Sequence, residues 1–486
     1  MKTNRVIKIF LASSEELEAD RYRFGNLIRK LDNIYEKRGI RIELFEWEDY
    51  DAAYNGMRKQ DEYNERVRAS DMFLALFHKK AGKFTIEEFN IARKAFDEQA
   101  SPKIYTYIKD LEAGESESRE LAEFKRLMLE ELGHYWCRYS NFDTMQLHFV
   151  LQLQMVEATT PIKVEVKESQ VKIGDSTIAD LNNVPFTSEN ATHRELQSRK
   201  EQLDREIGNA ESGGRRGFFG QRSRMTDEEL ANLREERESV TEQIERQEKA
   251  LVDTAMSIAR MQGGECSPRM RTAAELFEKG ETDKAEAVLK EDDMEADATN
   301  AKLKFDTAAQ PTAELARNIE RCAGEYMLKA RIVVSGIADE SRYRQAVKLM
   351  STAIDLVSGR LPEETLAEYL FDYAVLLADA GQQTKALETW ERLSGIYERL
   401  YRKAPQKYAY GYAGVLNNMA VLYSDKGDFD HCLSKYLKAI DIYDWLDREE
   451  PGIYDDDIAR LKNNLGTLYS DRDEYNKALS EFNEAA

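Results

Sequence analysis

Hydrophobic and polar positions change their spacing several times along this 486-residue chain. Near the N-terminus, short apolar runs at residues 6–12, 40–47, 72–77 and 103–108, with a possible fifth at 134–139, alternate with helical periods. The run Met72–Phe77 is apolar throughout, which is typical of a central strand covered on both faces. This alternation predicts an α/β domain over residues 1–158, built as a doubly wound, flavodoxin-like parallel sheet.

Two shorter patterns follow. Residues 159–188 alternate apolar and polar positions around a turn, which predicts a small β-hairpin linker. Residues 189–262 carry apolar positions at helical and coiled-coil spacing, and Thr226 with Glu229 matches a capping box that restarts a helix. We therefore expect an antiparallel helical hairpin with its tip at residues 213–224. Its apolar positions are Leu196, Leu203 and Ile207, then Leu233, Val240, Ile244 and Leu251.

The remaining residues, 263–486, are repetitive. Three sets of positions recur every 46 residues: Ala374, Ala420 and Gly466; Ala386, Cys432 and Ala478; Trp390, Tyr436 and Phe482. Small residues permit close helix contact and the aromatics fill the space beside them, so this pattern resembles tetratricopeptide repeats, whose usual length is about 34 residues. The longer period predicts longer helices or an added linker in an all-α solenoid. Weaker units lie upstream, around Ala273 and Ala346. Because a solenoid needs polar caps, we expect the array to continue beyond Ala486.

Composition narrows the class of protein. The chain has 8 prolines, a charged fraction of 33% and a formal net charge of −21, which favours a helix-rich protein and disfavours nucleic-acid binding outside a local basic patch. The sequence lacks a transmembrane run and a secretory signal, so we expect a cytoplasmic protein. The four cysteines and five histidines show no metal-binding spacing, so we expect no metal site.

One carboxylate stands out within the N-terminal domain. In the helix expected to begin near Thr85, Ile86, Phe89, Ala92, Ala95 and Phe96 share one arc, which contains Glu88 but not Glu87. Glu88 would then face the carboxyl edge of the strand Met72–Phe77, where open α/β sheets bind ligands. Thr85 and Glu88 also match a capping box, which would make the carboxylate purely structural.

Three segments carry a resemblance to a known family. F-L-A-S-S at residues 10–14, S-D-M-F-L-A-L-F at 70–77 and E-F-N-I-A at 88–92 resemble a Toll/interleukin-1 receptor (TIR) domain. In that family, the first strand, the loop after the second strand and a helical Glu build an NAD-cleaving site. The same segments resemble nucleoside 2-deoxyribosyltransferases, which share the fold and carry a comparable Glu. Lys83, Phe84 and Thr85 stand where TIR domains commonly carry a Trp-Cys pair.

The resemblance implies a single catalytic residue, Glu88, because nicotinamide in NAD is already cationic and leaves without a general acid. A carboxylate stabilises the oxocarbenium-like ribose that forms, as carboxylates do in sugar hydrolases. Each candidate for substrate binding has a structural alternative: serines cap helices, aromatics close cores and lysines are solvated. These candidates are Phe10, Ser13, Ser14, Trp47, Asp49, Tyr50, Phe77, Lys79 and Phe84.

The resulting hypothesis is a bacterial defence effector that hydrolyses NAD, self-associates through its TIR-like domain and senses an unknown protein or ligand through its repeats. NAD is a substrate here, and no cofactor is expected. A non-catalytic scaffold and a base-exchange enzyme remain alternatives. The tip at 213–224, in which four arginines surround Phe218 and Phe219, is either a contact surface or a flexible loop.

Overall fold

The computed structural model describes residues 5–37, 39–46, 59–132, 134, 136–156, 164–174, 176–212, 226–261, 266–336, 339–449 and 452–485. The chain divides into two compact units. The first comprises residues 1–156 and 162–188, and the second comprises residues 157–161 and 189–486. Among the described residues, no helix is both long and apolar enough to span a bilayer.

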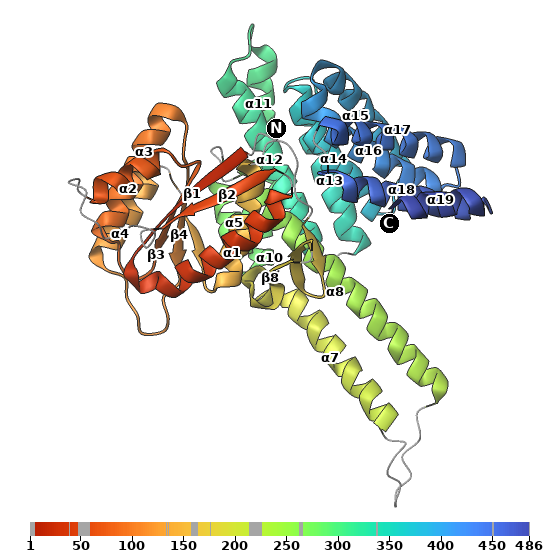
Figure 1. Ribbon diagram of the computed structural model, residues 1–486, viewed down its shortest axis with the longest axis horizontal. Helices are drawn as coiled ribbons and strands as arrows, with labels where there is room; N and C mark the ends of the chain where they lie inside the picture. Colours follow the sequence, from red (N-terminus) through yellow and green to blue (C-terminus); the bar gives the residue numbers. More distant parts are fainter. Residues whose placement is uncertain are drawn as a thin grey trace, which may run out of the picture. The chain divides into compact units, whose positions relative to one another are not determined.

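A five-stranded parallel sheet forms the centre of the first unit (Figure 1). Its strands are β1 (Arg5–Ser13), β2 (Ile40–Phe45), β3 (Met72–Phe77), β4 (Lys103–Lys109) and β5 (Cys137–Tyr139), in the order β2-β1-β3-β4-β5. Every neighbouring pair is parallel. The predicted flavodoxin-like sheet is therefore confirmed, and the fully buried β3 lies at its middle, as the apolar run indicated.

Helices cover both faces of this sheet. Figure 1 shows α1 (Glu18–Glu36), which follows a short 3-10 turn, and α5 (Phe142–Val156) on one side; Phe24 and Phe149 hold them together at 4.8 Å between ring centres. The helices α2 (Lys59–Arg68), α3 (Lys83–Gln99) and α4 (Arg119–Arg126), with a π-helical turn at Leu127–Glu131, cover the other side. Their apolar cluster contains Phe10, Ala12, Phe73, Phe77 and Phe89.

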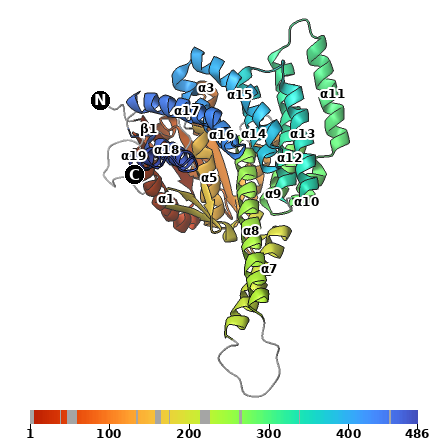
Figure 2. The same cartoon turned by 90° about the vertical axis from the view of Figure 1, so that its right-hand side faces the viewer.

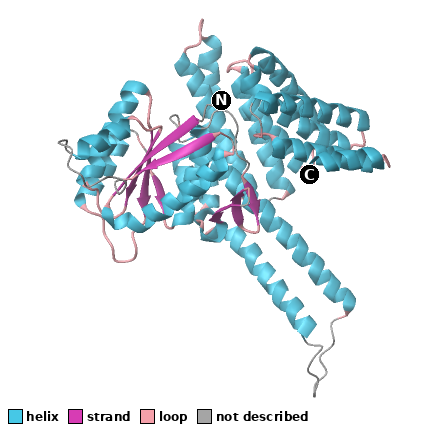
Figure 3. Cartoon of the chain, in the orientation of Figure 1, coloured by secondary structure: helices cyan, strands magenta, loops and turns pink. Residues whose placement is uncertain are grey.

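The predicted β-hairpin is part of a larger element. Three antiparallel strands, β6 (Glu165–Lys167), β7 (Gln170–Ile173) and β8 (Ser176–Asp180), form a second small sheet (Figure 3). Glu168 and Ser169 have positive φ angles of 53° and 56°, which suit the tight turn between β6 and β7. The sequence pattern predicted two strands and missed the third; the short helical segments Leu181–Asn183 and α6 (Pro185–Ser188) complete the unit.

A long helical hairpin opens the second unit. Its helices are α7 (Ala191–Ser212) and α8 (Asp227–Met261), which lie side by side in Figures 1 and 2. Leu203, Val240 and Ile244 form its apolar seam, and Arg199–Glu236 and Arg237–Asp204 ion pairs flank it. At the start of α8, Glu229 N–H donates to Thr226 Oγ1 (3.1 Å) and Thr226 N–H donates to Glu229 Oε2 (2.7 Å). The helical hairpin and the capping box are thus confirmed.

Paired helices make up the rest of the second unit, as the repeat pattern predicted. They are α9 (Pro268–Glu278), α10 (Thr282–Val288), α11 (Glu291–Thr307), α12 (Ala313–Ser335), α13 (Glu340–Val357), α14 (Glu363–Asp379), α15 (Gln383–Lys403), α16 (Pro405–Asp425), α17 (Phe429–Glu449), α18 (Asp455–Ser470) and α19 (Tyr475–Ala485).

The recurring residues occupy the positions that the tetratricopeptide-like pattern requires. Ala374, Ala420 and Gly466 are buried within α14, α16 and α18, and Ala386, Cys432 and Ala478 are buried within α15, α17 and α19. The α15, α16 and α17 helices have 21 residues each, which accounts for the long period.

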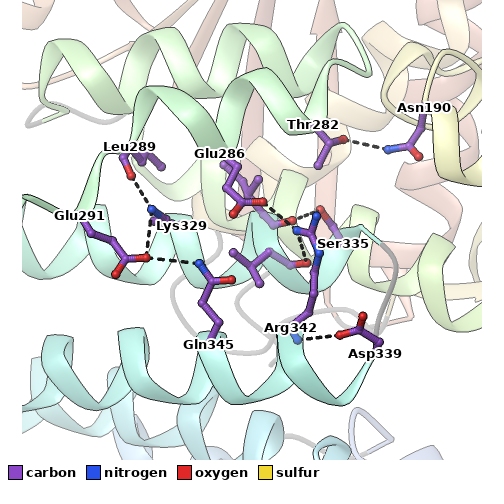
Figure 4. A network of polar contacts seen from close by, with 12 residues as sticks. Asn190, Thr282, Glu286, Leu289, Glu291, Lys329, Ser335, Asp339, Arg342 and Gln345 are labelled. Carbon is purple, nitrogen blue, oxygen red and sulfur yellow. Dashed lines mark hydrogen bonds and ion pairs between the residues drawn. The ribbon is translucent and has the colours of Figure 1, made fainter.

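Polar contacts join the earlier helices (Figure 4). Lys329 Nζ donates to the Leu289 carbonyl at 2.7 Å and pairs with Glu291 at 3.3 Å, which ties α12 to the residue after α10 and to the first residue of α11. Arg342 of α13 pairs with Glu286 of α10 at 2.7 Å. Buried charged groups need such partners, so these contacts fix how the irregular first repeats pack.

Candidate functional site

Glu88 lies in the second turn of α3, on the helix that follows β3. The helix begins at Lys83 rather than near Thr85, and its N-cap is Gly82, which has no side-chain cap hydrogen bond. The predicted capping box of Thr85 and Glu88 is therefore wrong, because both residues lie inside the helix. The side chain of Glu88 is only 8% exposed.

The arc that contains Glu88 is narrower than the sequence indicated. Phe89, Ala92 and Ala95 are buried, with Ile86 partly buried, but Phe96 is 45% exposed, so its prediction was wrong. Phe84, the proposed pocket wall or core residue, is 57% exposed. Because only the middle of α3 packs on the sheet, these two aromatic rings at its ends remain at the surface.

Glu87 does not simply face water, as helical phase suggested. It is half-buried, and its Oε1 accepts a hydrogen bond from Asn64 Nδ2 of α2 at 3.3 Å. Helix α2 packs along this side of α3, and the sequence period of α3 alone carried no sign of that neighbour. Glu87 thus has a structural role one residue away from Glu88.

Ser13 and Ser14 lie at the carboxyl end of β1 and are held by Arg21 of α1. Arg21 is almost fully buried, and its Nη1 donates to Ser13 Oγ at 2.8 Å and to the Ser14 carbonyl at 2.9 Å. Ser14 Oγ also donates to Glu16 Oε1 at 3.2 Å. Both serines therefore belong to a polar network on the α1 side of the sheet edge.

The loop after β3 is joined to the same edge. The backbone N–H groups of Lys79 and Lys80 donate to Glu16 Oε1 at 3.1 and 3.4 Å. The Lys79 side chain pairs with Glu115, whose carboxylate raises the pKa of Lys79, while Lys79 lowers the pKa of Glu115. Lys79 is thus engaged in an ion pair, which weakens its predicted role in substrate binding.

Phe10 and Phe77 lie on the α3 side of the sheet. Both are buried, at 2% and 0% exposed, in one cluster with Phe89. Phe10 stacks on Phe73 at 5.9 Å between ring centres, and Phe73 meets Phe89 edge-on at 6.5 Å. These aromatics form the apolar floor beneath α3 rather than an open wall. The predicted site residues are thus divided, with Phe10, Phe77 and Glu88 on the α3 side and Ser13 on the α1 side.

Two groups near these residues were missed by the sequence reasoning. His134 packs against Phe89 at 5.7 Å between ring centres and its Nε2 lies 3.0 Å from Thr106 Oγ1. Burial lowers the pKa of His134 to about 4, so the ring is neutral at pH 7.

The second missed group joins α1 to β4 and β5. Asp20 accepts from Lys109 Nζ at 2.9 Å and from Tyr139 Oη at 3.0 Å. These residues are far apart in the sequence, and only the parallel sheet brings them together at its carboxyl edge. No local motif signals such a group.

Several predicted residues cannot be placed. Trp47, Asp49 and Tyr50, and the tip at 213–224, lie outside the described residues. Within the described part of the chain, no group of three or more His, Cys, Asp or Glu side chains has the arrangement of a metal site.

No protein-family model and no curated protein matches this chain. Among solved structures, the chain is similar to BtubC (BKLC) from P. vanneervenii, at 17% identity and a TM-score of 0.32, over 60% of this chain and 89% of that one. It is also similar to a Signal Transduction ATPase with Numerous Domains (STAND) protein with a tetratricopeptide repeat sensor, PH0952 from Pyrococcus horikoshii. That likeness has 11% identity and a TM-score of 0.27, over 98% of this chain and 86% of the other. Neither likeness identifies a TIR domain or assigns a function to this chain.

Proposed function

We propose that the α/β unit hydrolyses NAD, with Glu88 as the catalytic carboxylate. The observation that carries the proposal is the burial of Glu88 within α3, on the side of the apolar floor of Phe10, Phe77 and Phe89 and away from the N-cap of that helix. A carboxylate in such surroundings interacts strongly with positive charge, because little water screens it. This is the property that the reaction requires.

The reaction breaks the bond between ribose C1′ and the nicotinamide nitrogen. The bonding electrons go to nicotinamide, which leaves as a neutral base, and positive charge develops on the ribose. Glu88 stabilises that charge, water adds to C1′, and one proton is released to solvent. The products are nicotinamide and ADP-ribose. The resemblance of residues 10–14, 70–77 and 88–92 to TIR domains supports NAD as the substrate.

The proposal is tested by comparing Glu88→Gln with Glu87→Gln, two adjacent and isosteric changes. Nicotinamide release by the full chain should fall by about 100-fold or more in Glu88→Gln, because an amide carries no charge to stabilise the ribose cation. Glu87→Gln should stay within a few-fold of wild type, since that side chain serves the contact with α2. Robust NAD cleavage by Glu88→Gln would remove Glu88 from the mechanism.

A non-catalytic assembly role is the second candidate, and one observation favours it. Phe84 is 57% exposed and lies one helical turn before Glu88, and an exposed aromatic ring is a common contact point between protein copies. Nicotinamide release should therefore be measured in size-separated fractions, with free base added to detect exchange. Absence of turnover in every fraction, including assembled ones, would favour the scaffold.

A further inference from the structure

The second unit contains a cavity of its own. Its volume is about 1240 Å³, and the helices α7, α8, α12, α13 and α14 line it. This volume is above the range of about 300–1,000 Å³ that is usual for small-molecule sites, so the cavity suits an extended ligand better than a single ion. All its lining residues belong to the second unit, so the cavity is independent of Glu88.

Helix α8 presents a polar stripe to this cavity. Gln243, Gln247, Thr254 and Ser257 lie at helical spacing. Gln243 is exposed, but the other three are buried, where packing against other helices would favour apolar side chains. Gln247 is only 4% exposed, and its Nε2 donates to Asn190 Oδ1 and to the Ser335 carbonyl, each at 3.4 Å. Its Oε1 has no hydrogen-bond partner among the described residues. A buried acceptor of this kind is costly unless a donor reaches it.

Carboxylates surround the same space. Asp253 of α8 and Asp372 and Asp379 of α14 all line the cavity. Arg331 of α12 pairs with Asp372 at 2.6 Å, and its only hydrogen bond to Asp253 is to the carbonyl, at 3.5 Å. The carboxylates of Asp253 and Asp379 thus take part in no ion pair within the described part of the chain.

These two carboxyl groups are poorly compensated. Burial raises the pKa of Asp253; Arg331 and Lys249 counter this effect, while Asp372 and Asp379 add to it. Partial desolvation also raises the pKa of Asp379, with Lys249 opposing, but Asp379 is exposed and Asp253 is the more buried of the two. Both carboxylates would therefore gain from an additional cation nearby.

We propose that this cavity binds an extended ligand carrying primary ammonium groups, either a free polyamine or the lysine side chains of a peptide. An ammonium group supplies donors for Gln247 Oε1 and positive charge for the partly buried Asp253 and the exposed Asp379, whereas an anion supplies neither. Five basic side chains also line the cavity. Arg199 and Arg331 are engaged in ion pairs with Glu236 and Asp372. Arg246, Lys249 and Arg260 are exposed, so water screens their repulsion. The net charge of −21 favours encounter with a cation.

The experiment is calorimetric titration of the full chain with two probes, spermidine and a capped trilysine peptide. The variant Asp253→Asn/Asp379→Asn should bind at least about tenfold more weakly to whichever probe binds the wild-type chain. The matched control, Glu201→Gln/Glu245→Gln, removes two exposed carboxylates of α7 and α8 that do not line the cavity, so it alters net charge equally. It should bind like wild type. Binding of spermidine alone would identify a free amine as the ligand, and binding of trilysine alone a peptide.

A second variant keeps the proposal testable if the double change impairs folding. Gln247→Met removes the acceptor without changing charge and should weaken binding several-fold. The proposal is overturned if neither probe binds wild type, if the control loses as much affinity as the cavity variant, or if pyrophosphate binds more tightly than both amines. These binding measurements do not depend on NAD turnover, so their outcome is independent of the test of Glu88.

Discussion

At the scale of single residues, His134 shows how the sheet controls a titratable side chain. The ring lies between Phe89 and Thr106, and burial lowers its pKa to about 4 from the usual 6.5. Because the folded chain holds the lower pKa, the unfolded chain takes up the proton first as the pH falls. The contribution of His134 to stability is therefore full above pH 6.5 and is lost as the pH falls from 6.5 to about 4.

This direction of the pH dependence leads to a prediction for His134→Gln. The substitution keeps a polar group near Thr106, but that group does not titrate. Lowering the pH from 7.5 to 4.5 should destabilise the wild-type α/β unit more than the variant, by up to about 3 kcal/mol. Urea unfolding followed by the fluorescence of a tryptophan in this unit measures the difference. An identical loss of stability in both proteins would show that His134 is not the group responsible.

Residue-scale prediction from the sequence had a clear limit. Helical phase placed Glu88 on the buried arc correctly, because that arc depends only on neighbours three and four positions away. Helical phase predicted the wrong exposure for Glu87 and Phe96. The exposure of these two side chains depends on how far α2 and the sheet extend along α3. His134 and Asp20 gave no local signal at all, since their partners come from distant strands.

At the scale of elements, close contacts between the last two helices explain one recurring small residue. A Cβ atom added to Gly466 of α18 would lie 2.7 Å from the Phe482 ring of α19. The ring occupies the space that the missing side chain leaves. The glycine and the aromatic residue of this repeat therefore form one packing unit.

Gly466→Ala should therefore destabilise the second unit by about 1–3 kcal/mol, because the ring must shift. Gly414 of α16 is the matched control, since a Cβ atom there would meet nothing within 4 Å. Gly414→Ala should be neutral or stabilising by up to about 1 kcal/mol, through better helix propensity. Thermal unfolding of both variants decides the matter; equal effects would contradict the packing argument.

Element-scale prediction was the most successful. The 46-residue period located α14 to α19, because each repeat packs mainly against its neighbours and so leaves a local signature. The helices α9 to α13 deviate from this period, and polar contacts such as Lys329–Glu291 and Arg342–Glu286 accompany the deviation. The third strand of the small sheet escaped prediction because β8, Ser176–Asp180, is short and lacks the strict alternation of β7.

At the scale of the whole molecule, the two units have separate cores, and we expect them to unfold in separate transitions. Phe24→Ala removes a fully buried ring of the first unit and should lower one transition, by about 3–5 kcal/mol. Gly466→Ala should lower only the other. Differential scanning calorimetry tests this, and one transition lowered by both substitutions would show that the units unfold together.

The sequence revealed the class of each unit but not the cavity of the second. Its walls come from α7, α8, α12, α13 and α14, which are joined by no motif. A polar stripe on α8 is equally typical of a solvated helix. Only the position of α14 beside it turns Asp253, Asp372 and Asp379 into neighbours.

The division of the candidate residues by the sheet has a consequence for any substrate of the first unit. Phe10 and Ala12 point to the α3 side of β1, and Ser13, held by Arg21, belongs to the α1 side. A molecule that reaches both Glu88 and Ser13 must straddle the sheet edge. A ligand confined to one side would meet only one of these residues. If the proposed NAD hydrolysis uses both, the length of the ligand contributes to selection, and we expect a dinucleotide to be preferred over a free nucleoside.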